Sequence, residues 1–228
     1  MVNNCVVLSE KSWHKDLFNK LKSEFTNIKW THIDNKIDFN EIFLTKLKPD
    51  IIFIPHWSNI INEKFFNKFK CIVFHMTDLP YGRGGSPLQN LIIRNKEQTK
   101  ISAIKVDFGI DSGDIYLKSD LDLSGSAKEI FARSSLVIFN MISEILIKEP
   151  KPIPQIGEIT IFKRRKPSQS SIMDLTNLNQ VYDYIRMLDC DGYPKAFIET
   201  SEIKFEFTNA KFDRNNNLID ANVRIFKK

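Results

Sequence analysis

Residues 71–87 read CIVFHMTDLPYGRGGSP, an apolar run that leads into a loop holding three of the eight glycines in the 228-residue chain. Short runs rich in Val and Ile, such as Cys71–Phe74, are typical of strands buried in a parallel sheet. His75 follows the run directly. Because open α/β sheets bind ligands at the carboxyl ends of their strands, we expect this loop to lie at a binding site.

Further apolar runs at Cys5–Leu8 and Ile51–Pro55 extend the pattern towards the N-terminus. Between the runs, apolar residues recur at helical spacing and predict two amphipathic helices. The first stripe is Trp13, Leu17, Leu21 and Phe25, and the second is Phe39, Ile42, Phe43 and Leu47. Strands that alternate with helices predict an α/β domain with a Rossmann-like parallel sheet and right-handed crossovers.

A long amphipathic pattern over residues 126–147 predicts one further helix, with Ser124 or Ser126 as its N-cap. Three prolines within residues 150–154 then stop that helix and predict an extended linker.

The segment beyond the linker has its own strand and helix patterns. We expect a strand at 158–162, a helix at 181–188 and a strand at 205–207. The sequence therefore predicts a catalytic domain in residues 1–150, followed by a linker and a small α+β appendage in residues 151–228.

Composition and charge restrict the class of protein. Hydrophobic residues make up 42% and charged residues 27%, as in water-soluble globular proteins, and no run of about twenty apolar residues or secretory signal is present. The three cysteines are scattered and have no metal-site or disulfide spacing, so we predict a cytoplasmic protein without a metal or a membrane partner. The net charge of +5 lacks a clustered basic footprint, so we predict no nucleic-acid partner.

The loop after His75 contains two prolines that stiffen it and three glycines that allow positive φ and close approach of a ligand. Arg83 supplies a cation among the glycines. A second loop follows the apolar run Ile104–Asp107 and carries Asp111 between two further glycines. Loops from neighbouring strands predict a His75–Asp111 pair, in which the carboxylate orients the ring for acid–base catalysis.

The order and spacing of these residues resemble the signature of the N10-formyltetrahydrofolate-dependent formyltransferases. That signature reads Asn-x-His-x-Ser-Leu-Leu-Pro-x-x-Arg-Gly-x-x-Pro, followed by Asp-x-Gly-Asp-Ile. The matching residues here are His75, Leu79, Pro80, Arg83, Gly84 and Pro87, followed by Asp111, Gly113, Asp114 and Ile115. The resemblance covers roughly the first 150 residues and implies formyl transfer from N10-formyltetrahydrofolate to an amine.

The resemblance also implies roles for individual residues, with His75 and Asp111 as the catalytic pair. Trp57 fits the wall of a folate pocket and the hydrophobic core equally well. The implied donor-binding residues are His56, Trp57, Ser58, Leu79, Pro80, Asp107 and Gly109. The implied substrate-binding residues are Arg83, Gly84, Gln89 and Asn90.

One position departs from the family signature. The asparagine that lies two residues before the histidine is replaced by Val73, which has no amide. A preorganised donor to an oxyanion is worth about 3 kcal/mol, so we expect another group to replace it. The candidates are protonated His75, a backbone N–H, and the side chain of Gln89 or Asn90, of which we favour the side chains.

The C-terminal region resembles the linker and short C-terminal portion of sugar N-formyltransferases. A tRNA-modifying member would be expected to carry about 80–100 further residues on domain-size grounds. We therefore predict a sugar N-formyltransferase of polysaccharide biosynthesis that acts on a nucleotide-linked amino sugar. The alternatives are an enzyme like methionyl-tRNA formyltransferase without the full C-terminal domain, and a non-catalytic module that binds folate or a nucleotide sugar. A homodimer is compatible with each.

Overall fold

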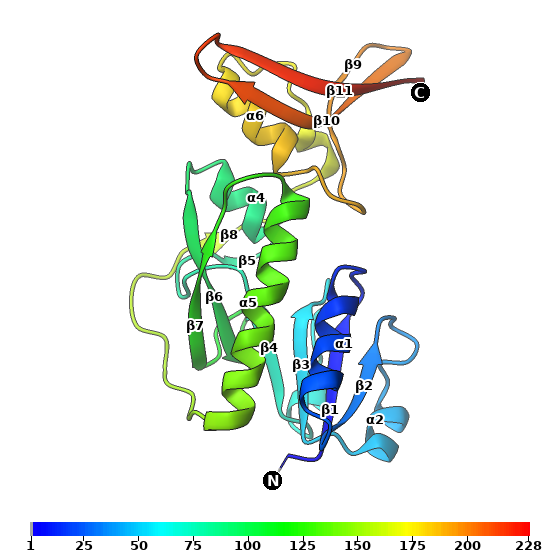
Figure 1. Ribbon diagram of the computed structural model, residues 1–228, viewed down its shortest axis with the longest axis vertical. Helices are drawn as coiled ribbons and strands as arrows, with labels where there is room; N and C mark the ends of the chain where they lie inside the picture. Colours follow the sequence, from blue (N-terminus) through cyan, green and yellow to red (C-terminus); the bar gives the residue numbers. More distant parts are fainter. Residues whose placement is uncertain (1) are drawn as a thin grey trace. The chain divides into compact units, whose positions relative to one another are not determined.

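The computed structural model describes residues 2–228, and strands alternate with helices through the first half of the chain (Figure 1). Six strands form one sheet in the order β2-β1-β3-β4-β6-β7. β1 pairs in parallel with β2 and β3, and β3 pairs in parallel with β4, which confirms the predicted Rossmann-like α/β class. The strands are β1 (Asn4–Ser9), β2 (Lys29–Ile33), β3 (Ile51–His56), β4 (Cys71–His75), β6 (Gln98–Lys105) and β7 (Ile115–Asp122).

The strand β6 departs from the predicted parallel arrangement, because it runs antiparallel to β4. His75, at the carboxyl end of β4, pairs with Ser102, whereas Lys105, the last residue of β6, pairs with Ile72. The chain that leads to Asp111 therefore leaves β6 beside the amino-terminal end of β4, whereas His75 lies at the carboxyl end of β4. The expectation of a wholly parallel sheet is wrong at this strand, since an apolar run has the same pattern in both directions.

The first helices of the chain are α1 (His14–Glu24), α2 (Glu41–Leu47), α3 (Glu63–Phe66) and α4 (Pro87–Ile92). α1 buries Leu17 and Leu21, as its apolar stripe predicts. α2 begins after Asn40, whose side chain accepts a hydrogen bond from the N–H of Phe43, and it buries Leu44. Ile42 is 85% exposed, so the second predicted stripe is wrong at this position.

The helix α5 (Ala127–Lys148) begins directly after Ser126, and Ser126 rather than Ser124 makes the capping hydrogen bonds. The Ser126 N–H donates to Glu129 Oε2 at 2.7 Å and the Glu129 N–H donates to Ser126 Oγ at 3.3 Å, a reciprocal capping box. α5 lies beside α1, where the Lys20 ammonium is 4.0 Å from the centre of the Phe139 ring. Within residues 2–228 it is the one helix long and apolar enough to cross a membrane, and half of its most apolar stretch is buried, as in a core helix.

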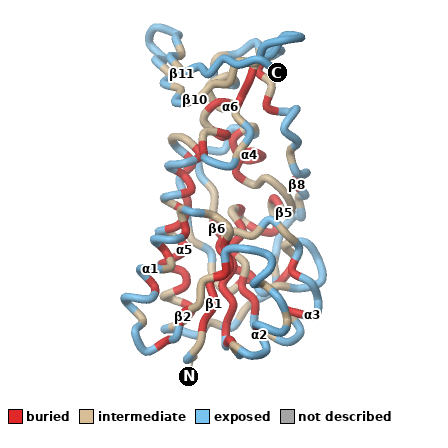
Figure 2. The backbone as a smooth tube through the Cα atoms, turned by 90° about the vertical axis from the view of Figure 1, so that its right-hand side faces the viewer, coloured by how far each residue is buried: buried red, intermediate tan, exposed pale blue. Residues whose placement is uncertain are grey.

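The chain divides into two compact units that interleave along the sequence, whereas the sequence predicts one boundary at residue 150. The first unit comprises Met1–Gly84, Thr99–Leu121 and Ala132–Ile161, and the second comprises Gly85–Gln98, Asp122–Phe131 and Phe162–Lys228. In the first unit, buried residues gather along the central strand β1 (Figure 2). Val6 and Leu8 of β1 and Ile52 and Ile54 of β3 are at most 2% exposed.

The second unit contains an antiparallel sheet in the order β11-β10-β9, formed by β9 (Ala196–Glu199), β10 (Ile203–Asp213) and β11 (Leu218–Lys227). The short 3-10 helix η1 (Pro167–Ser170) and the helix α6 (Leu178–Arg186) precede this sheet. The Tyr182 ring of α6 packs 5.7 Å from the Phe212 ring of β10, centre to centre. The predicted α+β character of this region is confirmed, although β8 (Ile161–Phe162) is shorter than the predicted strand.

A buried histidine in the first unit makes the stability of the fold depend on pH. His14 is 1% exposed, and its Nδ1 lies 2.7 Å from Ser9 Oγ. Burial lowers the pKa of His14 to about 3, and the nearby His56, His32 and Lys11 act in the same direction.

We expect the free energy of unfolding to fall as the pH drops through 6.5. The unfolded chain protonates His14 near pH 6.5 and the folded chain only near pH 3, so the unfolded state binds more protons between these values. The loss is at most about 1.4 kcal/mol per pH unit. Urea unfolding at neutral and mildly acidic pH measures it. His14→Gln should lose less stability than the wild type on acidification. Equal losses in the wild type and His14→Gln would contradict the assignment.

Candidate active site

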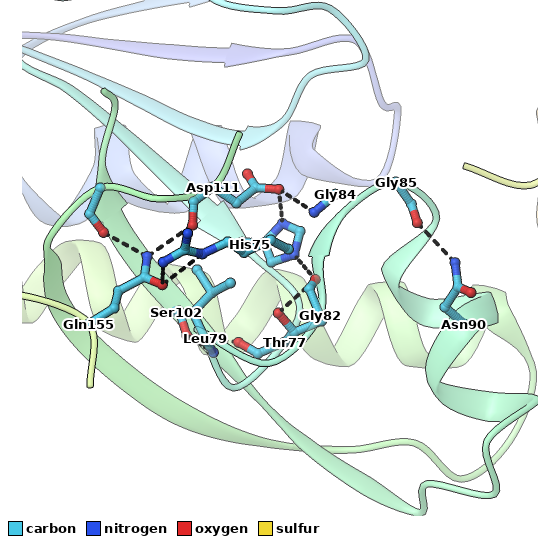
Figure 3. A network of polar contacts seen from close by, with 12 residues as sticks. His75, Thr77, Leu79, Gly82, Gly84, Gly85, Asn90, Ser102, Asp111 and Gln155 are labelled. Atoms are coloured by element: carbon cyan, nitrogen blue, oxygen red, sulfur yellow. Dashed lines mark hydrogen bonds and ion pairs between the residues drawn. The ribbon is translucent and has the colours of Figure 1, made fainter. Parts of the chain in front are cut away.

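His75 is 7% exposed and takes part in the network of polar contacts shown in Figure 3. Its Nε2–H donates to the carbonyl oxygen of Gly82 at 2.8 Å. Because a carbonyl oxygen only accepts, this bond fixes one proton on Nε2 and leaves Nδ1 as the nitrogen that gains or releases a proton. Thr77 supports the same carbonyl group, to which its Oγ1 donates at 3.3 Å.

The carboxylate of Asp111 faces the other side of the His75 ring. Its Oδ2 lies 3.4 Å from His75 Nδ1 and accepts a hydrogen bond from the Gly84 N–H at 2.8 Å. The structure thus brings together the histidine and the aspartate that the two loops predict (Figure 3). The carboxylate can balance a positive charge on the ring when Nδ1 is protonated.

The glycine loop positions the carbonyl group that holds His75. Gly82 and Gly84 have φ values of 79° and 106°, a region that favours glycine because other residues are strained there. β5 (Arg83–Gly84) pairs with β8, and the N–H groups of Gly82 and Arg83 donate to the Thr160 carbonyl oxygen at 3.0 and 2.9 Å. Two of the three glycines therefore serve the backbone path that presents Gly82 to His75.

Gln155 connects the glycine loop to the loop that carries Asp111, and sequence analysis gave it no role. Its Oε1 accepts from Arg83 Nε and Nη2 at 3.1 and 2.8 Å. Its Nε2 donates to the carbonyl oxygens of Asp111 and Gly113 at 2.9 and 2.8 Å. The only sequence signal is a polar residue directly after the proline-rich linker. Substrate binding by Arg83 stays a prediction, since the contacts of its guanidinium here are to Gln155.

Of the predicted donor-binding residues, Leu79 lies in the hydrophobic core and Trp57 is partly buried against it. Leu79 is fully buried and packs with Ile104 and Ile115. Trp57 packs against the core under β1 and β3, with its ring 5.7 Å from that of Phe39, centre to centre. The core interpretation of Trp57 is therefore the better supported of the two.

The other predicted donor-binding residues are held by local contacts. Ser58 Oγ donates to the Glu10 carboxylate, and the His56 ring is 5.9 Å from the Trp13 ring, centre to centre. The Pro80 carbonyl oxygen accepts a hydrogen bond from the Thr160 N–H at 3.3 Å. In the loop before Asp111, Asp107 Oδ1 accepts a hydrogen bond from the Phe108 N–H at 2.7 Å. Gly109 lies so close to Ser112 that a Cβ at this position would be 2.2 Å from Ser112 Oγ. Their roles in donor binding stay predictions.

Gln89 and Asn90 are only 4% and 5% exposed, and their amide groups are occupied by backbone groups of the second unit. Gln89 Nε2 donates to the Met187 carbonyl oxygen at 3.0 Å. Asn90 Nδ2 donates to the carbonyl oxygens of Gly85, Ser86 and Lys163, each at 3.0 Å. Both side chains therefore have a structural role. Their amide N–H groups are used in these bonds, so neither is the donor that replaces the family asparagine at Val73.

Comparisons with known proteins identify the relatives of the chain. Residues 167–226 match a family model described as the C-terminal domain of methionyl-tRNA formyltransferase. The solved structure of methionyl-tRNA formyltransferase from Clostridium thermocellum is 50% identical, with 100% of each chain covered and a TM-score of 0.96. Methionyl-tRNA formyltransferase from Francisella philomiragia is 30% identical over 71% of this chain and 54% of that protein. The chain spans about half the length of the first curated relatives it matches.

A sugar N-formyltransferase from a Shewanella species shares the fold alone, at 12% identity and a TM-score of 0.68, with 87% of this chain and 93% of that chain covered. The predicted amino-sugar substrate and sugar N-formyltransferase activity are therefore wrong, because the 50% identity is to a methionyl-tRNA formyltransferase. The prediction of no nucleic-acid partner is contradicted by the same finding. The length argument failed because residues 167–226 already match a C-terminal domain of that enzyme class.

We expect Asn90→Ala to lower the free energy of unfolding by about 1–3 kcal/mol, because it removes a buried amide that three carbonyl groups share. Exposed Gln98→Ala serves as the control for the loss of an amide side chain. Urea unfolding of both variants measures the difference. Unchanged stability of Asn90→Ala would contradict the structural role of this side chain.

Proposed function

The chain belongs to the N10-formyltetrahydrofolate-dependent formyltransferase family, and we propose that it formylates the amino group of methionyl-tRNA. The observation that carries this proposal is the 50% identity with the Clostridium thermocellum methionyl-tRNA formyltransferase over the full length of both chains. The match of residues 167–226 to the C-terminal domain of that enzyme class supports the same substrate. The formyl donor of the family is N10-formyltetrahydrofolate.

The reaction requires a base, because the amino group must lose a proton as its nitrogen bonds to the formyl carbon. We assign that proton to Nδ1 of His75, since Nε2 already carries a proton that is bound to the Gly82 carbonyl oxygen. The Asp111 carboxylate, 3.4 Å from Nδ1, then balances the charge of the imidazolium ring. The imidazolium can return the proton to the nitrogen of the donor from which the formyl group departs.

The oxyanion that forms during transfer needs a donor other than the side chain of Val73. Because the amide nitrogens of Gln89 and Asn90 donate to backbone carbonyl groups, we propose protonated His75 or a backbone N–H for this role. The family asparagine can donate a hydrogen bond to the oxyanion. A protonated ring beside the reacting carbon would donate a hydrogen bond and would also carry a positive charge.

We place the formyl donor against the loops that carry His56–Ser58, Leu79–Pro80 and Asp107–Gly109. The exposed apolar side chains next to Asp111 support this placement, because Phe108 and Ile110 are 74% and 65% exposed. Flat aromatic ligands bury their faces against such side chains, while backbone groups contact their polar edges. Phe108 and Ile110 thus offer apolar surface that fits the face of a pterin ring.

A run of basic residues supports a nucleic-acid partner. Four consecutive basic residues lie near the beginning of the last segment of the second unit, and all but Arg165 are exposed: Lys163, Arg164, Arg165 and Lys166. Contacts of Lys and Arg with phosphates release counterions and dominate the affinity of proteins for nucleic acids. The net charge conceals this run, because acidic residues elsewhere offset it.

The proposed function is tested by incubating the chain with N10-formyltetrahydrofolate and methionyl-tRNA. Mass spectrometry of the amino acid released from the tRNA should show a gain of one formyl group. Uncharged tRNA and free methionine serve as controls and should give no product. Formylation of free methionine, or no formylation of methionyl-tRNA, would overturn the proposal.

We expect His75→Ala and Asp111→Asn each to lower kcat by about a hundredfold or more, as for the loss of acid–base catalysis. The asparagine keeps an oxygen that can accept the Gly84 N–H, so its effect reports the lost charge rather than a lost contact. Asp78→Asn, in which an exposed carboxylate is removed, is the matched control. Near-normal turnover of either variant would contradict the assigned mechanism.

Gln155 is expected to act as a positioning residue for Asp111. Gln155→Ala should lower kcat by about tenfold, with a smaller change in KM, because the Asp111 loop loses two hydrogen bonds that orient it. In an Asp111→Asn background the same change should have little further effect. If the two losses of rate multiply, Gln155 acts independently of Asp111 and the positioning role is contradicted.

A further inference from the structure

Both ring nitrogens of His75 face a hydrogen-bond acceptor, and the position of those acceptors decides which nitrogen holds the proton of the neutral ring. Nε2 lies 2.8 Å from the Gly82 carbonyl oxygen, and Nδ1 lies 3.4 Å from Asp111 Oδ2. A neutral ring has one N–H and can donate to only one of them. The ring can act as a base at Nδ1 only while the Gly82 carbonyl oxygen keeps the proton on Nε2. The proposed mechanism therefore depends on the position of this carbonyl group.

A glycine gives the carbonyl group little rigidity of its own. The φ of Gly82 is 79°, one of many conformations that are open to glycine. The N–H groups of Gly82 and Arg83 donate to the Thr160 carbonyl oxygen at 3.0 and 2.9 Å. These bonds join the glycine loop to the segment that follows the proline-rich linker, whereas His75 belongs to the sheet. Beyond the bond to the ring itself, a contact with the sheet is needed to keep the carbonyl group in place.

Ser102 and Thr77 supply that contact. Ser102 is fully buried on β6 and pairs with His75 across the two strands. Its Oγ donates to the Thr77 carbonyl oxygen at 2.7 Å and accepts from the Leu79 N–H at 3.3 Å, so it holds the loop that leaves β4. Thr77 Oγ1 in turn donates to the Gly82 carbonyl oxygen at 3.3 Å (Figure 3). The contacts thus run from the residue opposite His75 to the oxygen that the ring binds.

The burial of Thr77 shows what its hydroxyl group adds. The residue is fully buried, and burying a hydroxyl group costs free energy unless it is hydrogen-bonded. Valine has nearly the same shape and would pack at this position without that cost. What threonine adds over valine is a donor to the carbonyl group that holds His75.

We propose that Thr77 and Ser102 are positioning residues for His75, which hold the neutral ring in its Nε2–H form through the Gly82 carbonyl group. The inference rests on the proposed role of His75 as the base. In the other neutral form the proton lies on Nδ1, beside Asp111, and the lone pair of Nε2 faces a carbonyl oxygen. Nδ1 then has no lone pair with which to accept the proton of the amino group.

Nitrogen NMR of the labelled ring distinguishes the two neutral forms and needs no substrate. In alkaline solution the wild type should show His75 protonated on Nε2, with its signals assigned by their loss in His75→Gln. Thr77→Val should move the Nδ1 and Nε2 signals towards each other, as exchange between the two forms requires. Thr77→Ser keeps the hydroxyl group and should give the wild-type spectrum. Thr45→Val, which removes an exposed hydroxyl group on α2, is the matched control and should also leave the spectrum unchanged.

The kinetics of formylation test the same contacts. Thr77→Val should lower kcat by about tenfold with KM nearly unchanged, because the base is misplaced in the bound complex. Thr77→Ser should restore kcat to within about twofold of the wild type. Ser102→Ala should also lower kcat, and it should add little in the Thr77→Val background because the two residues act in one chain of contacts. The melting temperature of each variant separates these effects from unfolding.

Thr77→Val with the kcat and the ring signals of the wild type would overturn the inference. It would also be overturned if Thr77→Ser were as slow as Thr77→Val, since the hydroxyl group would then not be responsible, or if the losses of rate multiplied in the double variant. If the ring signals respond as expected but methionyl-tRNA is not formylated, the proposed function fails and the positioning role stands. Formylation with ring signals that do not respond to Thr77→Val would leave the proposed function intact and overturn the positioning role alone.

Discussion

The Asp111 carboxylate accepts a hydrogen bond from the Gly84 N–H at 2.8 Å and faces the His75 ring, and the geometry of the candidate site depends on this contact. Because β6 runs antiparallel to β4, the chain leaves β6 beside Ile72 and not beside His75. The loop must therefore be held by contacts outside the sheet. Gln155 supplies the second of these through the Asp111 carbonyl oxygen. Strand register alone would not bring the two side chains together.

Features that depend on residues close in sequence could be predicted. The apolar runs of β1, β3 and β4 predict buried strands. Ser126, with Glu129 three residues later, predicts the start of α5. The positive φ of Gly84 likewise follows from a glycine-rich turn. Each of these patterns acts over a few residues, so a single sequence contains the information.

Features that depend on residues distant in sequence could not be predicted. The direction of β6, the exposed face of α2 around Ile42 and the bonds of Gln155 are decided by which segments meet in space. The substrate was predicted wrongly for a related reason. Net charge averages over the chain, so it does not reveal the local run of basic residues that begins at Lys163. Length likewise says little about a C-terminal domain that is built compactly from an α-helix and three strands.

Two buried histidines show how their neighbours separate a structural role from a chemical one. His14 and His75 are 1% and 7% exposed, so burial alone does not distinguish them. The electrostatic neighbours of His14 are the side chains of His56, His32 and Lys11, which carry no negative charge to balance a proton, and the His14 ring stays neutral. His75 has a carbonyl oxygen 2.8 Å from Nε2, which binds the proton of the neutral ring, and a carboxylate 3.4 Å from Nδ1, which can balance the charge when Nδ1 is protonated. A histidine that can be accommodated in either state is the one suited to transfer protons, and this argues for His75 as the base of the reaction.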